Sequence, residues 1–251
     1  CDISCPPFSE RIDLSLRNKE ITFFWITVVM NNVSLSGRQK FLDELPDSKQ
    51  KSIDVETIRC LNWNIRNPSL QRATKQMVWL EKNRFDIIAL TEVRPSEGAV
   101  YIRDRLMSQG YTVIFAKPEN EDYSVILAVR RFFEAVPKIC IDFLPYRVSF
   151  ATCHFSGEAV LVTGIYAPVW KTGKKRKFVE AFERFIERKD WRKRFSGWII
   201  LGDLNVLEPN HIPHHSVYEG WENFYNVFIK HGLVDAFRFF HPEEREYSWF
   251  G

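Results

Sequence analysis

The stretch Phe85–Val93, "FDIIALTEV", is the feature that most constrains the fold, because its apolar side chains run on without alternating with polar ones. A strand of this kind is buried on both faces, so other parts of the chain must cover its sheet on either side. The stretch Trp198–Asn205, "WIILGDLN", begins with a similar apolar run. Both stretches indicate an α/β protein with sheets inside and helices outside.

A regular order of predicted elements begins at Glu56. Apolar periodicity predicts helices over 69–84, 98–110, 171–194 and 216–232. Strand-like segments follow one another closely between the second and third helices, which favours hairpins and a mixed or antiparallel sheet. The predicted strands are 57–65, 85–93, 111–116, 123–131, 135–144, 147–155, 159–167 and 198–205.

The 251 residues, 45% of them hydrophobic and 27% charged, suit one large domain or two small ones. Residues 1–55 have no clear rhythm, so we assign them to an N-terminal leader that need not be native, and expect 1–29 to be dispensable. The apolar run Ile21–Met30 is about half the length that spans a bilayer, so no membrane partner is expected. Residues 56–251 form the predicted domain.

Charge is concentrated in one segment. Residues 171–194 hold eleven Lys and Arg and four Asp and Glu, a charge of +7, which leaves −4 for the remainder of a chain whose formal charge is +3. The segment is either the solvated face of a helix or a stripe that meets phosphates. Its apolar stripe is Phe178, Phe182, Phe185 and Ile186.

The five cysteines are scattered and odd in number, with no C-x-x-C pair. This pattern is typical of buried thiols in a reducing compartment, and it favours neither a disulfide framework nor a zinc site. We therefore expect a cytoplasmic protein. We also expect it to be a monomer.

Polar oxygen donors close three of the predicted strands: Asn64, Glu92, and the pair Asp203 and Asn205. Residues two apart on a strand share a face, so Asp203 and Asn205 are expected to point the same way. Each residue alone could be an ordinary turn or cap residue. Together, oxygen donors without Cys or His suit a hard cation such as Mg²⁺ or Mn²⁺.

The blocks "LNWNIR", "DIIALTEV", "VTGIYAP", "ILGDLNV", "GLVDAFR" and "YSWF" occur in this order between Leu61 and Phe250. From about Thr57 onward the chain resembles the endonuclease/exonuclease/phosphatase superfamily, and most closely its exonuclease III and AP endonuclease branch, which acts in DNA repair. The resemblance implies a four-layer α/β sandwich, in which two packed mixed β-sheets are flanked by helices. It also implies metal-dependent phosphoester hydrolysis, with the phosphate backbone of DNA as the partner.

The resemblance also implies residue roles. Glu92 resembles the main Mg²⁺ ligand, and Asn64 resembles the amide beside the metal and the scissile phosphate. Tyr166 resembles the phosphate-contacting tyrosine. Asp203 resembles the carboxylate that aligns or deprotonates the attacking water, and Asn205 the amide that supports the phosphate.

Further substrate contacts are open to two interpretations. Arg66 and Arg94 follow strand ends and either touch phosphates or pair with Glu92. Lys174 and Lys175 lie in the basic segment, and Trp249 either stacks on bases or ribose or belongs to the core. His211, His214 and His215 lie in a proline-containing loop, where solvated histidines are more usual than metal ligands.

Members of the family carry an Asp, and then an Asp-His pair, after the "YSWF" block. The chain has no match to them, so we expect its last strands to be missing and its hydrolytic activity to be impaired. Two alternatives to a DNA-acting nuclease stay open: a phosphatase of inositol or lipid phosphates on the same fold, and a non-catalytic fragment.

Overall fold

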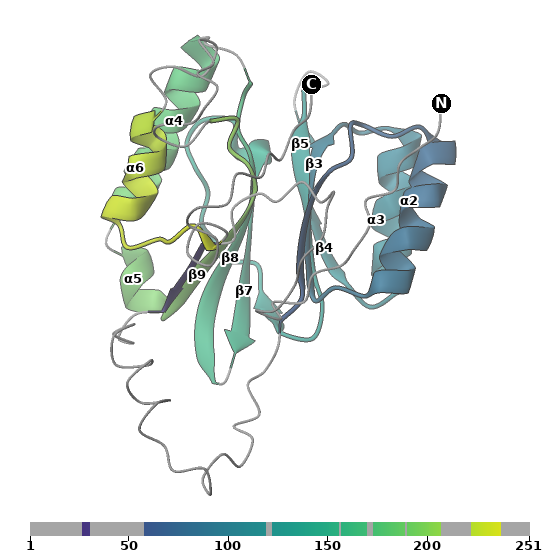
Figure 1. Cartoon of the computed structure of the whole chain (residues 1–251), viewed down its shortest axis with the longest axis horizontal. Helices are drawn as coiled ribbons and strands as arrows, with labels where there is room; N and C mark the ends of the chain where they lie inside the picture. The colour runs from purple at the N-terminus through teal and green to yellow at the C-terminus, as the bar shows by residue number, and fades with distance from the viewer. Residues whose placement is uncertain are drawn as a thin grey trace, which may run out of the picture.

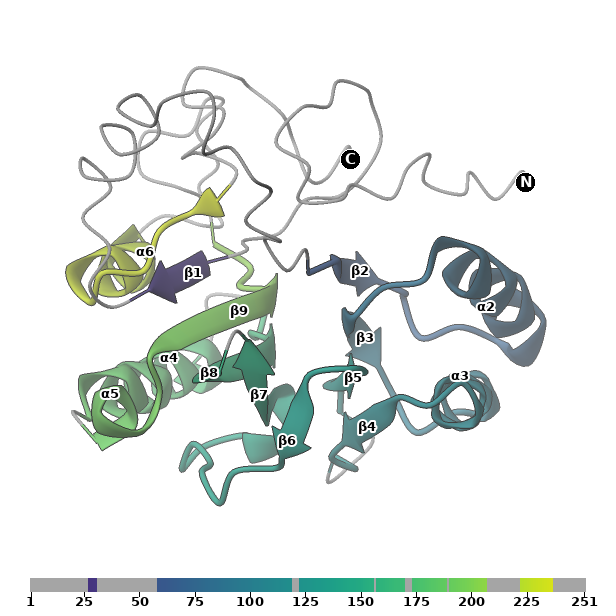
Figure 2. The same cartoon turned by 90° about the horizontal axis from the view of Figure 1, so that it is seen from below.

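Two β-sheets lie face to face, and helices cover the outer face of each, so that four layers follow one another across the molecule (Figures 1 and 2). The structure is a computed structural model. It describes residues 27–30, 58–118, 122–155, 157–169, 173–188, 190–206 and 222–236. The predicted four-layer α/β sandwich is confirmed.

The first sheet has four strands, of which β2 and β3 are parallel and the other neighbours antiparallel. In spatial order they are β2 (Cys60–Asn64), β3 (Ile87–Val93), β5 (Ser124–Val129) and β4 (Thr112–Phe115). Its outer face is covered by α2 (Leu70–Asn83) and α3 (Glu97–Ser108). Ser69 and Ser96 cap these two helices, because each side chain accepts a backbone N–H of the first turn.

The second sheet has five strands, with β8 and β9 parallel and the other neighbours antiparallel. In spatial order they are β1 (Thr27–Met30), β9 (Gly197–Asp203), β8 (Glu158–Tyr166), β7 (Val148–Phe155) and β6 (Phe133–Ala135). A single 3-10 turn, η3 (Pro145–Arg147), precedes β7. On the outer side lie α4 (Gly173–Glu187), α5 (Asp190–Arg194) and α6 (Glu222–Lys230).

Three apolar clusters fill the three spaces between the layers. The sequence of β3 is continuously apolar because its side chains pack into two of these clusters, one on each face of the sheet. Ile87 and Ala89 pack between the sheets, whereas Ile88 and Leu90 pack against α2 and α3. On the other side, Phe182 of α4 packs against Trp198 of β9, and Phe178 stacks on Phe182.

The predicted strand over 135–144 is wrong. Strand β6 ends at Ala135, and the residues that follow are irregular up to η3. Pro137 lacks the N–H that a sheet ladder requires, and five of the six side chains from Glu134 to Ile139 are not buried.

Several expectations on the rest of the chain have mixed outcomes. Residues 27–30, which fall in the expected leader, form β1 at the edge of the second sheet. The predicted thiols differ in burial, since Cys153 is buried, Cys60 half-buried and Cys140 exposed, and all three are free. In the described ranges, no helix has both the length and the apolarity needed to cross a bilayer.

Candidate active site

The site is built from strand ends of both sheets. Asn64 is the last residue of β2, and Glu92 is the last but one of its parallel neighbour β3. Tyr166 and Asp203 are register partners at the ends of the parallel strands β8 and β9. The two sheets are joined here by a hydrogen bond from Asn62 Nδ2 to the Gly202 carbonyl oxygen (3.3 Å). Asn64 and Glu92 both act on Asp203 here, Asn64 through a side-chain hydrogen bond and Glu92 through its charge.

Asp203 is buried, with 8% of its surface exposed. Burial raises the pKa of its carboxyl group to about 6, and the negative charge of Glu92 acts in the same direction. Hydrogen bonds from the Asn205 N–H and the Asn64 side chain, together with the charge of Lys175, limit this rise in pKa. Asp203 is thus a carboxylate near neutral pH that can also accept a proton.

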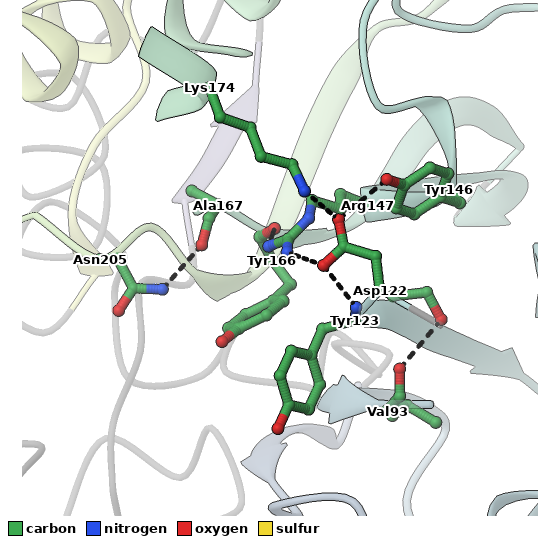
Figure 3. Close-up of polar contacts among 10 residues, drawn as sticks. Val93, Asp122, Tyr123, Tyr146, Arg147, Tyr166, Ala167, Lys174 and Asn205 are labelled. Carbon is green, nitrogen blue, oxygen red and sulfur yellow. Dashed lines mark hydrogen bonds and ion pairs between the residues drawn. The ribbon is translucent and has the colours of Figure 1, made fainter. Parts of the chain in front are cut away.

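The relation between Asp203 and Asn205 differs from the one expected. The strand ends at Asp203, so alternation along a strand does not bring the two side chains together. Instead, the Asn205 N–H donates to Asp203 Oδ1 (2.9 Å), and Asn205 has a φ of 51°. Its side-chain amide donates to the Ala167 carbonyl (2.8 Å, Figure 3). Asp203 and Asn205 therefore do form a turn, which was one of the two interpretations of these residues, and this turn orients the Asp203 carboxylate.

Backbone strain gathers around the same strand ends. Seven non-glycine residues of the described chain have positive φ, and four of them lie here: Arg66, Asn67, Glu92 and Asn205. At Glu92, with φ 54°, the pairing of β3 with β5 shifts register between Leu90 and Val93. Such strained residues cost free energy and cluster at functional sites.

Tyr166 is 2% exposed, and its ring contacts Tyr123 and Arg147. Burial raises the pKa of its phenol far above the ordinary value, and the charges of Glu92 and Asp203 raise it further. The hydroxyl group therefore stays protonated and can donate a hydrogen bond. The Tyr123 ring meets the Tyr166 ring edge-on at 6.0 Å, and the Arg147 guanidinium lies 4.9 Å from the Tyr166 ring centroid.

Asp122 connects the loop before β5 to the second sheet, and sequence reasoning did not single it out (Figure 3). It accepts hydrogen bonds from Arg147 Nη2 (2.7 Å), Tyr146 Oη (2.9 Å) and the ammonium group of Lys174. Burial alone would raise the pKa of Asp122, but the bonds from Lys174 and Arg147 hold it well below its usual range. The cluster fixes Arg147, which also donates to the Tyr166 carbonyl (3.3 Å).

Comparison with solved structures finds the same arrangement of sheets and helices. The 3′ phosphatase NExo from Neisseria, bound to a product DNA hairpin, has a TM-score of 0.60 and 20% identity over 74% of this chain and 76% of its own. The 3′-5′ exonuclease NExo from Neisseria meningitidis has a TM-score of 0.60 and 22% identity, covering 76% and 78%. An AP endonuclease from Archaeoglobus fulgidus has a TM-score of 0.58 and 25% identity, covering 75% and 76%.

This is the exonuclease III and AP endonuclease fold. The resemblance to the endonuclease/exonuclease/phosphatase superfamily is thereby confirmed at the level of structure. No family model and no curated protein matches the sequence itself.

On the exonuclease III fold, the predicted substrate contacts occupy different environments. Arg66 is exposed, and its N–H donates to Asn64 Oδ1 (3.1 Å). The Arg94 guanidinium stacks 4.1 Å from the Tyr123 ring centroid, and among the described residues neither arginine forms an ion pair with Glu92. Lys174 is paired with Asp122. Trp249 and the three loop histidines lie outside the described residues.

Lys175 differs most from the expected surface contact, because it is fully buried. A sequence signal for this exists. Lys175 precedes Phe178 by three residues and Phe182 by seven, which places it on the apolar face of α4.

The oxygen donors at the strand ends fit a hard cation. The negative charge of Glu92 disfavours ionisation of Asp203, and a cation at this site would relieve this. No set of three or more His, Cys, Asp or Glu side chains suited to a metal occurs within the described part of the chain. Mg²⁺ commonly uses only one or two protein carboxylates, with water and substrate phosphate completing its shell.

Proposed function

We propose that this chain is a metal-dependent phosphodiester hydrolase that acts on DNA, of the exonuclease III type. The observation that carries the proposal is the meeting of Asn64, Glu92, Tyr166 and Asp203 at one end of the paired sheets. DNA as the substrate class is supported by the solved structures with this fold, which include a 3′ phosphatase with its DNA product and an AP endonuclease.

In this proposal Glu92, with Asn64 beside it, holds Mg²⁺ or Mn²⁺. The ion, when bound, polarises a phosphoryl oxygen and offsets the charge that develops there. Asp203 orients a water molecule and takes its proton, which its elevated pKa allows.

Two uncharged groups complete the proposed site. The protonated hydroxyl of Tyr166 donates a hydrogen bond to a phosphate oxygen without bringing a second cation into the site. Asn205 supports the phosphate through its turn, and Arg66, Arg94 and Trp249 are proposed contacts along the strand of DNA.

The test is hydrolysis of labelled duplexes that carry an abasic site or a 3′-phosphate, with and without Mg²⁺. Asp203→Asn should lower the rate about a hundredfold or more, because it removes the proton acceptor. Asp142→Asn is the matched control, since Asp142 forms an exposed ion pair with Arg184 of α4, away from the strand ends that form the site. Equal rates for Asp203→Asn and the parent chain would contradict the proposal. Cleavage of inositol phosphates without cleavage of DNA would favour the phosphatase alternative.

A further inference from the structure

Lys175 is a fully buried cation on the apolar face of a helix. Its relative exposure is 0%, whereas its neighbours Lys174, Arg176 and Lys177 are exposed. Placing an ammonium group inside a protein is costly unless polar groups receive it. Burial also lowers the pKa of Lys175 to about 8, against the opposing effect of Asp203. A lysine in this position cannot serve as an exposed phosphate contact.

The ammonium group of Lys175 joins the two segments that leave the site strands. It donates to the carbonyl oxygen of Asn205, two residues beyond the end of β9. It also donates to the carbonyl of Val169 (3.3 Å), three residues beyond the end of β8. One side chain of α4 therefore ties together the chain after Tyr166 and the chain after Asp203.

The Asn205 turn needs such support. Asn205 has a φ of 51°, a conformation that costs free energy for a residue other than glycine. Its N–H is the donor that meets Asp203 Oδ1, so the orientation of the carboxylate depends on the backbone conformation of Asn205. The carbonyl that Lys175 holds belongs to the same residue.

We propose that Lys175 is a positioning residue that fixes the Asn205 turn, and through it the Asp203 carboxylate, without touching the substrate. The expected effect of Lys175 on kcat rests on the proposed function, whereas its expected effect on the backbone at Asn205 does not. Its structural consequence is that the Asn205 peptide opens more often when the ammonium group is removed.

Lys175→Met removes the charge and the donors while keeping a stem of similar length. It should lower kcat on DNA about tenfold to a hundredfold with little change in KM, because a small misplacement of a catalytic group has effects of that size. Lys175→Arg retains buried donors and should recover part of kcat. Lys82→Met, at an exposed lysine on α2, is the matched control and should change neither parameter.

Hydrogen exchange of the Asn205 amide supplies a readout that needs no activity. The exchange rate should rise in Lys175→Met and stay unchanged in Lys82→Met. If Lys175→Met does not fold, Lys175→Gln, which removes the charge but keeps an uncharged NH2 donor group, takes its place in both measurements. A raised KM with a shallower salt dependence would show a phosphate contact and overturn the proposal, as would unchanged exchange at Asn205. Absence of both hydrolysis and Mg²⁺ binding by the parent chain, with exchange behaving as expected, would reject the proposed function and leave Lys175 as a positioning residue.

Discussion

Gly202 lies directly against its register partner Ile165: a Cβ atom placed on Gly202 would come within 1.9 Å of the Ile165 carbonyl oxygen. The φ of Gly202, 150°, is also one that side chains rarely allow. This close approach stands one residue before the pair Tyr166 and Asp203, so glycine at this position lets β8 and β9 deliver both side chains to the site.

Replacing Gly202 by alanine should therefore destabilise the fold by about 3 kcal/mol, the upper range for overpacking, because backbone atoms must move. Chemical denaturation measures the change as a lower midpoint. Gly173→Ala is the control, since nothing lies within 4 Å of its Cβ position, and its midpoint should not fall. Equal midpoints for both variants would contradict the close approach.

Trp198 and Thr163 form a buried side-chain hydrogen bond of 2.8 Å within the second sheet. Trp198→Phe should cost about 1–3 kcal/mol through the unpaired hydroxyl group, in addition to lost packing. Thr163→Val in the Trp198→Phe background should then cost less than it does alone. The double-mutant cycle in the free energy of unfolding checks this, and strictly additive costs would argue against the bond.

The stability of the protein should depend on the ionisation of Asp122 in acid. The folded-state pKa of Asp122 lies below its ordinary value of 3.8, so its ion pairs stabilise the fold above about pH 4. That contribution is lost as the pH falls through the depressed pKa. Asp122→Asn should cost about 1–3 kcal/mol at pH 7, and the difference from the parent chain should shrink below pH 4. Asp142→Asn, at the exposed pair with Arg184, should cost about 0.5 kcal/mol or less at either pH.

Mg²⁺ affinity should rise with pH through about pH 6. Protonation of Asp203, whose pKa burial raises to about 6, removes a negative charge beside the proposed cation at Glu92, so binding of the proton and of the cation oppose each other. Titration calorimetry between pH 5 and pH 7.5 should show tighter binding at the higher pH, with a proton released. Glu92→Gln should weaken binding strongly, whereas Asp203→Asn should remove most of the pH dependence. Affinity that is independent of both pH and Glu92 would place the metal elsewhere.

The main elements of the fold could be predicted because their signals are local. The continuous apolar runs of β3 and β9, the spacing of Ala73, Met77 and Leu80 in α2, and the order of strands and helices all survive in the structure. The predicted strand over 135–144 was wrong. Its apolar residues resembled a strand, but Pro137 and the exposed side chains around it excluded one. The four residues of β1 pair with β9 across more than 160 positions, and nothing in their own sequence specifies that partner.

The site was predictable only in part. Strand-end position identified Asn64, Glu92 and Asp203, and the family resemblance identified Tyr166. The turn at Asn205 and the burial of Lys175 depend on tertiary contacts. Asp122 had no local signal, because its importance comes from Arg147 and Lys174, which are distant in sequence. The expected impairment of hydrolytic activity stays a prediction.

The hydrogen bond between Asn62 and Gly202 joins residues that are 140 positions apart, and it has a consequence for folding kinetics. Closing a chain segment of that length is entropically costly, and contacts of high sequence separation slow folding. Each sheet can gather its own hairpins, β4 with β5 and β7 with β8, before the sheets meet. The candidate site should therefore be among the last parts of the molecule to form, so intermediates with native-like secondary structure will lack a competent centre.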